Sequence, residues 1–367
     1  MPVAVFYVSG HGYGHASRQI EILRALHAVR PDVRIVIRTQ APRWLFERGL
    51  DFAIRFEPLE TDTGVVQIDS LNVDVRASIA RADAFHRSLG DRAAIEAARL
   101  TDGRADLVVG DVPPLACAAA ARAGIPAIAI GNFTWDWIYA GYPETAVQAP
   151  HLVRVLRRAY ATAAAAWRLP LHGGFDAFDE VVDVPLVARR SYREPVDIRR
   201  QLGLPSDRAL ALCAFGRYGV GAIDWSRVAR LDGYHVVFTA SPHAAGGPGG
   251  DAFTTIDEAG LARQGLGYED VVAAVDVVVT KPGYGMIAEC AANDTAMLYT
   301  SRGRFPEHDV LVAGLPDLVR AECIGHEPLF AGRWQNHLDR LMAQPRPEPP
   351  AADGAQAVAG ALAARLG

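Results

Sequence analysis

Cysteines are few in this chain and show no pairing pattern. The 367 residues contain four, Cys117, Cys213, Cys290 and Cys323, which lie far apart and form no C-x-x-C pair. This spacing argues against a disulfide framework and against a cysteine zinc site. We therefore predict a reducing, cytoplasmic location.

Long apolar runs and an excess of basic residues are also missing. No apolar run reaches the roughly 18 residues that a membrane span requires. The first segment, MPVAVFYV, has neither the basic leader nor the cleavage pattern of a signal peptide and is typical of a first strand. The formal net charge is −5, so no basic surface for nucleic acid is indicated. The sequence predicts no membrane span and no nucleic-acid partner, and it says nothing of the oligomeric state.

Three familiar ligand-binding signatures are absent as well. The chain has no G-K-[ST] of a P-loop, which excludes ATP hydrolysis of that type. The dinucleotide fingerprint fails at its third glycine, where His15 stands, and IVIRTQ ends in no acidic residue, so a nicotinamide enzyme is a weak interpretation. No Asp-x-Asp pair occurs, so we expect no metal to hold a diphosphate and no metal site.

What the chain does have is a repeated alternation of short apolar runs and amphipathic segments. Such alternation predicts parallel sheets with helices on both faces, the α/β class. In the first half, strands are expected at 3–8, 33–38, 52–56, 106–109 and within GIPAIAIG, with helices at 17–29 and 117–123. In the second half, strands are expected at 210–215, 234–239, 276–280 and 296–299.

The basic, proline-containing stretch at 185–208 separates these two halves and is typical of a domain connection. We predict two doubly wound, Rossmann-like domains, at 1–190 and 200–345, followed by a Pro-rich linker and terminal helix at 346–367. Ligands of such folds bind at the carboxyl ends of the strands, which places them in the cleft between the halves.

The stretch VSGHGYGHASRQIEIL, at 8–23, is the first candidate for chemistry. Its glycines allow a tight turn and a close approach of ligand to backbone, and the turn opens onto a helix N-terminus that favours anions. Histidine is the natural general base near neutral pH. His11 and His15 are therefore candidate catalytic residues; the alternative is that they only cap the turn.

Asp111 directly follows the strand of DLVVGD, at the same sheet edge as the glycine turn if the two strands are parallel. A carboxylate there could orient an imidazole and stabilise its protonated form. A simple helix cap is an equally good interpretation.

A second glycine turn, KPGYGM at 281–286, follows a later strand and precedes another helix. Its backbone N–H groups and Lys281 favour a phosphate. Glu289, farther along that helix, could accept hydrogen bonds from sugar hydroxyls; the alternative is complementarity to the helix dipole.

Charged and aromatic residues gather after two further strands. Arg302, Arg304, Glu307, His308 and Asp309 crowd YTSRGRFPEHDVL, which is either a binding segment or a solvated loop. NFTWDWIYAGY is aromatic-rich and predicts either a stacking wall for a sugar or planar acceptor, or a hydrophobic plug. Its aromatic residues are Phe133, Trp135, Trp137, Tyr139 and Tyr142.

Taken together, these motifs resemble glycosyltransferases of the GT-B fold over nearly the whole chain. The likeness is to the glycosyltransferase of lipid II synthesis and to the glycosyltransferase-like N-terminal region of L-arabinokinases, to which SGHGYGHASR is especially similar. The resemblance implies that His15 takes the proton of an acceptor hydroxyl, that Asp111 orients it, and that His11 lines the acceptor or β-phosphate region. The reverse assignment of the two histidines stays open.

The same resemblance implies the binding residues. The family's nucleotide-ribose glutamate lies six residues after a turn glycine, which is the spacing of Gly283 and Glu289. The sugar-contacting segment usually reads Asp-Gln and here reads Glu307-His308-Asp309, which leaves the donor sugar open. The implied donor-binding residues are Gly216, Arg217, Lys281, Pro282, Gly283, Tyr284, Gly285, Met286, Glu289, Arg304, Glu307, His308 and Asp309. The implied acceptor-binding residues are Gly12, Tyr13, Gly14, Phe133, Trp135, Trp137 and Tyr139.

The resulting expectation is a metal-independent, inverting transfer of a hexose from a nucleoside-diphosphate sugar, with UDP favoured, to a hydroxyl of a small acceptor such as a sugar, nucleoside or natural product. No cofactor is expected besides this co-substrate. Two alternatives stay open: a nucleotide-sugar epimerase on the same scaffold, and a non-catalytic module that binds a sugar nucleotide.

Overall fold

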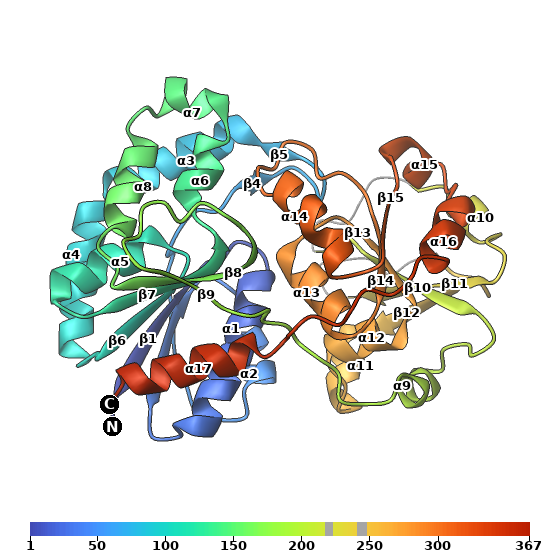
Figure 1. The fold of residues 1–367 in the computed structure, drawn as a ribbon, viewed down its shortest axis with the longest axis horizontal. Coiled ribbons are helices and arrows are strands. Elements are labelled where there is room, and N and C mark those ends of the chain that lie inside the picture. Colours follow the sequence, from blue (N-terminus) through green and yellow to red (C-terminus); the bar gives the residue numbers. More distant parts are fainter. Residues whose placement is uncertain (217–222, 241–247) are drawn as a thin grey trace.

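The computed structural model describes residues 1–216, 223–240 and 248–367. Two parallel sheets, each covered by helices on both faces, lie side by side (Figure 1). This arrangement is the predicted pair of doubly wound layers. No helix in the described ranges is both long and apolar enough to cross a membrane.

The first sheet has the order β3-β2-β1-β6-β7-β8-β9. Its interior strand β1 is buried along its whole length, because helices cover both faces of the sheet. Its strands are β1 (Val3–Val8), β2 (Arg34–Thr39), β3 (Arg55–Pro58), β6 (Leu107–Asp111), β7 (Ala127–Phe133), β8 (Ala165–Gly173) and β9 (Val181–Asp183). A small antiparallel pair, β4 (Val66–Gln67) and β5 (Val73–Asp74), stands beside it.

The second sheet has the order β12-β11-β10-β13-β14-β15. Its strands are β10 (Ala209–Ala214), β11 (Tyr234–Ala240), β12 (Phe253–Asp257), β13 (Val277–Thr280), β14 (Ala296–Tyr299) and β15 (Ala321–Cys323). In each sheet the chain order reverses beside the first strand, β1 or β10. Such switch points are where open α/β sheets bind ligands.

Helices connect the strands in both halves. Those of the first half are α1 (Gly14–Val29), α2 (Arg43–Gly49), α3 (Val75–Arg87), α4 (Leu89–Asp102), α5 (Pro114–Ala123), α6 (Trp135–Ala140), α7 (Pro143–Gln148) and α8 (Leu152–Tyr160). Those of the second half are α9 (Pro195–Leu202), α10 (Trp225–Val228), α11 (Glu258–Arg263), α12 (Tyr268–Ala274), α13 (Tyr284–Ala292), α14 (His308–Gly314), α15 (His326–Phe330) and α16 (Gln335–Met342). A short 3-10 turn, Leu315–Asp317, follows α14.

The last helix, α17 (Gly354–Arg365), returns to the first half and packs against α1. The two chain ends therefore lie near each other on that half (Figure 1). Arg30, just after α1, donates through Nη1 to the carbonyls of Ala363 and Gly367 at 3.2 and 3.0 Å. The terminal helix thus ties the end of the chain to the half that contains its beginning.

Several expected elements shift by a few residues. The strand expected at 52–56 is β3 at Arg55–Pro58, and the helices expected from 17 and 117 begin earlier, at Gly14 and Pro114. The 185–208 connection contains α9, which the sequence analysis did not anticipate. Helix ends move because glycine and proline are tolerated in a first turn, where backbone N–H groups have no intrahelical partner.

Candidate active site

The glycine turn and Asp111 meet at one sheet edge. Strands β1 and β6 are parallel neighbours, with Val8 paired to Asp111, so both chains leave the sheet at the same end. The turn then places His15 in the first turn of α1. Gly12 has φ +77°, a backbone conformation that residues other than glycine rarely adopt.

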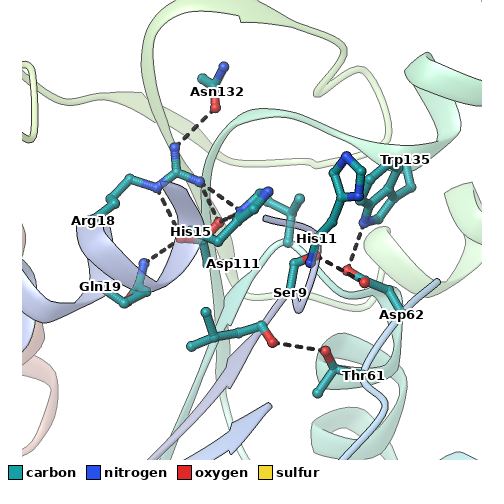
Figure 2. A network of polar contacts seen from close by, with 12 residues as sticks. Ser9, His11, His15, Arg18, Gln19, Thr61, Asp62, Asp111, Asn132 and Trp135 are labelled. Carbon is teal, nitrogen blue, oxygen red and sulfur yellow. Dashed lines mark hydrogen bonds and ion pairs between the residues drawn. The ribbon is translucent and has the colours of Figure 1, made fainter. Parts of the chain in front are cut away.

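His15 and Asp111 are in direct contact in this structure. His15 Nδ1 lies 2.8 Å from Asp111 Oδ1, and both side chains are buried (Figure 2). Arg18 donates from Nε to Oδ2 at 2.9 Å and from Nη2 to Oδ1 at 2.5 Å, and Gln19 adds a bond to Oδ2 at 2.8 Å. Arg18 also donates from Nη1 to Asn132 Oδ1 at 3.0 Å. Asp111 is thus the common acceptor of one buried network.

The charge state of Asp111 favours one tautomer of His15. Burial alone would raise the pKa of Asp111, but the neighbouring charges of Arg18 and His15 outweigh it and hold that pKa well below its usual range. An ionised carboxylate can only accept a hydrogen bond, so the shorter contact, with Asp111, favours a neutral His15 whose proton is on Nδ1, against Arg18 Nη2, a donor that lies 3.1 Å from the same nitrogen. Its Nε2 is then left as a proton acceptor.

His11 lies in a second, adjoining network. Its backbone N–H donates to Ser9 Oγ at 3.2 Å, and Ser9 Oγ donates to Asp62 Oδ1 at 3.0 Å (Figure 2). Trp135 Nε1 donates to the other oxygen of Asp62 at 2.9 Å, and its ring packs edge-on against His11. Burial, then the charge of Arg302, lowers the pKa of His11 well below its usual value, so His11 is neutral. Because the protonated form of His11 is disfavoured, its imidazole is better suited to hydrogen bonding with a hydroxyl than to taking up a proton.

Asp62 is itself a buried titratable group beside the histidines. Burial raises its pKa to about 6, against the lowering effect of His15 and its two hydrogen-bond donors. Gly64, in the same loop, has φ +57°, and a Cβ there would lie 2.5 Å from Nδ1 of His11. The loop of 61–64 therefore needs its glycine to leave room for His11.

The aromatic segment is mostly core. Phe133, Trp135, Tyr139 and Tyr142 are at most 5% exposed and share one hydrophobic cluster. Trp137 is half-buried, and a Cβ at Gly173 would collide with its ring. The alternative of a hydrophobic plug describes these contacts, while Trp135 still reaches the site by its edge. An acceptor-stacking role for the other rings stays a prediction.

The second glycine turn faces the first across the two halves. It connects β13 to α13, at the switch point of the second sheet. A Cβ built on Gly285 would lie 3.6 Å from the Cα of Gly14. Arg18 Cζ lies 5.2 Å from the centre of the Tyr284 ring. The two predicted motifs therefore contact each other, although they belong to different sheets.

Lys281 shares its surroundings with Arg302 and Glu307. Burial, then repulsion from Arg302, lowers the pKa of Lys281 to about 7. Arg302 is buried, lies 3.4 Å from Glu307 Oε1 through Nη1, and has an Nε atom with no described partner. Burial raises the pKa of Glu307, which Arg302 opposes. Besides Glu307, Asp69 is the other carboxylate that acts on Lys281. A buried arginine beside a half-buried lysine favours an anionic ligand.

The other charged or titratable residues of that loop differ from Arg302 in exposure. Arg304 is exposed and donates to both oxygens of Glu144, at 2.8 and 2.9 Å, so its charge is already paired across the halves. Asp309 is exposed and His308 half-buried in the first turn of α14. The structure thus buries Arg302, which the donor assignment left out, beside Glu307. The donor-binding role of Arg304 stays a prediction.

A cavity of about 1100 Å³ opens between the two halves. Among the predicted residues, it is lined by Tyr13, Gly14, Gly216, Gly285, Met286 and Glu289. Its lining includes Gly14 and Ser17, on either side of His15 in the sequence, but not His15, Lys281 or Glu307. Gly216 has φ +74° at the end of β10, whereas Arg217 lies outside the described residues.

Glu289 does not stand alone in that cavity. It is 5% exposed, and Arg189 donates to its Oε1 from Nε at 2.8 Å and from Nη2. Burial raises the pKa of Glu289, while Arg189 lowers it.

Sequence reasoning missed Arg18, Asp62 and Arg189. Arg18 lies within the 8–23 stretch, three residues after His15, and this helical spacing was a signal that could have identified it. The other two stand in loops without a motif. In the described part of the chain, no cluster of three or more His, Cys, Asp or Glu residues is arranged to hold a metal ion.

Sequence comparison identifies one relevant relative. The chain is 30% identical to L-arabinokinase of Arabidopsis thaliana over 354 residues, which is 93% of this chain and 32% of that protein. The chain therefore spans about a third of the length of the curated relative that it matches. No family model matches the chain. The likeness to L-arabinokinase that the motifs indicated is confirmed.

Solved structures give the fold. CalG4, the calicheamicin glycosyltransferase, has a TM-score of 0.60 at 16% identity, covering 100% of this chain and 95% of its own. The spinosyn rhamnosyltransferase SpnG, complexed with thymidine diphosphate, has a TM-score of 0.58 at 13% identity, with coverages of 100% and 96%. A UDP-glucosyltransferase from Polygonum tinctorium has a TM-score of 0.60 at 13% identity, with coverages of 98% and 93%. The fold is GT-B, as predicted.

Proposed function

We propose that this chain is an inverting glycosyltransferase. It moves a hexose from a nucleoside-diphosphate sugar, with UDP favoured, to a hydroxyl of a small acceptor such as a sugar, nucleoside or natural product. One observation carries the proposal: the His15–Asp111 pair stands at the strand ends of one sheet, directly beside the Gly283–Gly285 turn at the strand ends of the other. A base and an anion site thus meet where a GT-B fold has its cleft.

The proposed base is Nε2 of His15. The acceptor hydroxyl gives its proton to Nε2 while its oxygen forms a bond to the anomeric carbon of the donor. The bond from that carbon to the β-phosphate oxygen breaks, and the nucleoside diphosphate leaves with the electron pair. Attack opposite the leaving group inverts the anomeric centre. Asp111 stabilises the imidazolium that forms, because its carboxylate is ionised and 2.8 Å from Nδ1.

The departing diphosphate needs positive charge on its own side of the cleft. The backbone N–H groups that begin α13 are one source, and Lys281 and Arg302 are the side-chain source. Fixed dipoles and cations in a buried site stabilise developing charge without a metal ion. Metal independence is part of the proposal.

The nucleoside occupies the cavity between the halves in this proposal. Glu289 lines that cavity and would accept hydrogen bonds from ribose hydroxyls. The thymidine diphosphate in the SpnG structure and the name of the UDP-glucosyltransferase support a nucleoside diphosphate as the donor class. They leave the base open between uracil, thymine and others.

An epimerase remains the second candidate, because the structure places two buried carboxyls with raised pKa near the histidines. Burial raises the pKa of Asp62 to about 6 and also raises that of Glu307. A carboxyl such as that of Asp62, which exchanges its proton near neutral pH, suits elimination and re-addition of a sugar.

One experiment tests both candidates. The chain is mixed with a panel of UDP-, GDP-, TDP- and ADP-sugars, with and without a library of hydroxyl acceptors, and products are followed by mass spectrometry and NMR. A glycosyltransferase releases nucleoside diphosphate and forms a glycoside only with an acceptor. An epimerase changes the sugar without an acceptor. A nucleotide that binds without any turnover indicates a binding module and contradicts the proposed enzyme.

A further inference from the structure

Arg189 lies in the segment between β9 and α9 that connects the two halves, and the sequence indicated nothing more than a connection there. Its Nε and Nη2 donate to Glu289 Oε1, Nε at 2.8 Å. Its Nη1 lies 3.6 Å from Glu269 Oε2, and its Cζ lies 5.7 Å from the centre of the Tyr268 ring. Contacts with α12 and α13 therefore hold the guanidinium in one place.

Only one of the two oxygens of the Glu289 carboxylate is hydrogen-bonded within the described part of the chain. Oε1 of Glu289 accepts both N–H groups of Arg189, whereas Oε2 is buried and has no hydrogen-bond partner among the described residues. Glu289 and Arg189 both line the cavity between the halves. A buried acceptor atom without a donor is unfavourable, so this atom is suited to receive a ligand hydroxyl.

We infer that Arg189 is the positioning residue for Glu289: it donates two hydrogen bonds to Oε1 and leaves Oε2 to accept a ribose hydroxyl of the donor. The inference rests on the proposed function, because it takes the nucleoside to lie in this cavity. An arginine suits this role because its guanidinium places two N–H groups on Oε1 of Glu289 while its Nη1 stays 3.6 Å from Glu269 Oε2.

Electrostatics supports the same role. Burial raises the pKa of Glu289 and Glu269 raises it further, while Arg189 is the charge that lowers it. Without Arg189 the carboxyl is protonated at a higher pH and then offers the ribose a poorer acceptor. The other titratable or charged groups that line the cavity are Tyr13, Glu21 and Arg24 at α1, Arg48 on α2, Cys213 on β10, Glu258 on α11, and Tyr268, Glu269 and Asp270 on α12. Cys290 follows Glu289 on α13. Arg189 is the cation in contact with Glu289.

The test compares two ligands on five proteins. The ligands are the nucleoside diphosphate that the wild-type chain binds best in the panel above and its 2′,3′-dideoxy analogue. The proteins are wild type, Arg189→Met, Arg189→Lys, Glu289→Gln and the control Arg190→Met, in which the next, exposed arginine is replaced. Dissociation constants are measured by calorimetry from about pH 6 to about pH 8.5, after thermal unfolding has shown that each variant is folded.

We expect the wild-type chain to prefer the ribose ligand by about tenfold or more, the ratio typical of a charged hydrogen bond. Arg189→Met should lose most of this preference, and its affinity for the ribose ligand should fall as the pH is lowered. Arg189→Lys should restore the pH profile in part, because it restores the charge but not the fork. Arg190→Met should behave like the wild type.

Two results would overturn these statements separately. If Arg189→Met keeps the ribose preference and the pH profile of the wild type while Glu289→Gln loses the preference, the role of Arg189 is wrong and the ribose site stands. If Glu289→Gln also keeps the preference, the placement of the ribose in the proposed function is wrong.

Discussion

Asp111 accepts hydrogen bonds from Arg18 through both of its oxygens, at 2.9 Å from Nε and 2.5 Å from Nη2. Both side chains are almost fully buried. The pair therefore does more than orient His15: it neutralises a buried carboxylate and ties α1 to the end of β6. Any substitution of Asp111 acts on this tie as well as on the imidazole.

Asp111→Asn should destabilise the protein by about 3–5 kcal/mol, because it leaves the Arg18 guanidinium buried without its counter-charge. Urea unfolding followed by circular dichroism measures this. Asp309→Asn, at an exposed carboxylate in the second half, is the control and should shift the free energy of unfolding by less than about 0.5 kcal/mol. Equal effects of the two substitutions would show that the Arg18–Asp111 pair is energetically neutral.

His15→Ala should lower turnover by about 10²–10⁴-fold with little change in donor affinity, since a general base acts in the transition state. His11→Ala should mainly change substrate binding, because burial and the charge of Arg302 keep His11 neutral. Initial rates and calorimetric donor affinities of both variants decide between them. An inactive His11→Ala beside a nearly normal His15→Ala would reverse the assignment.

Lys281 should make nucleoside-diphosphate binding sensitive to pH. Burial lowers its pKa to about 7, so the ammonium that attracts the diphosphate is present below that pH and is lost above it. Affinity should therefore fall by up to about tenfold per pH unit as the pH rises above 7. Lys281→Arg, which stays charged, should give a flatter profile. Calorimetry in buffers of different ionisation enthalpy should show proton uptake on binding by the wild type, and its absence would rule out this role.

Arg302→Met should weaken nucleotide-sugar binding or turnover by about tenfold to a hundredfold, the loss expected for a charged hydrogen bond. Arg304→Met is the matched control two residues away, because its guanidinium is exposed and already paired with Glu144. Its effect should be less than about threefold. Steady-state kinetics with a fixed acceptor separates the two, and a larger effect at Arg304 would restore the assignment made from the sequence.

Nucleoside diphosphate should bind with the same affinity in EDTA as in magnesium. The reason is the positive end of α13 with Lys281, together with the lack of an Asp-x-Asp pair in the sequence. Calorimetric titration in both buffers measures this. Binding that requires magnesium or manganese would contradict the metal-independent mechanism.

Much of this arrangement could be predicted because it depends on local pattern and on the geometry of parallel sheets. The apolar runs at 3–8 and 106–109 became adjacent parallel strands, and the residues that follow parallel neighbours must emerge at one edge. The meeting of His15 with Asp111 follows from that rule. The turns at 10–14 and 281–286 were visible for the same reason, since glycine before a helical pattern marks a strand-to-helix connection.

Burial within a loop was not predictable in this way. Arg302 and Arg304 stand two residues apart with the same chemistry, yet one is buried beside Glu307 and the other is exposed against Glu144. Most of the aromatic residues that follow β7 stand on α6 and likewise pack into the core, because α8 packs against α6. Which side of a loop is covered depends on elements distant in sequence.

The sequence by itself determined the two doubly wound sheets, the sheet edge at which chemistry is expected and the residue types available there, because strand period, glycine and chain order act locally. Only the tertiary structure decided which charges share a partner. Arg18 reaches Asp111 across 93 residues, Asp62 reaches Trp135 across 73, and Arg189 reaches Glu289 across 100. Such contacts depend on the packing of whole elements, and burial then sets the charge of each group, since desolvation and the nearest ion determine its pKa.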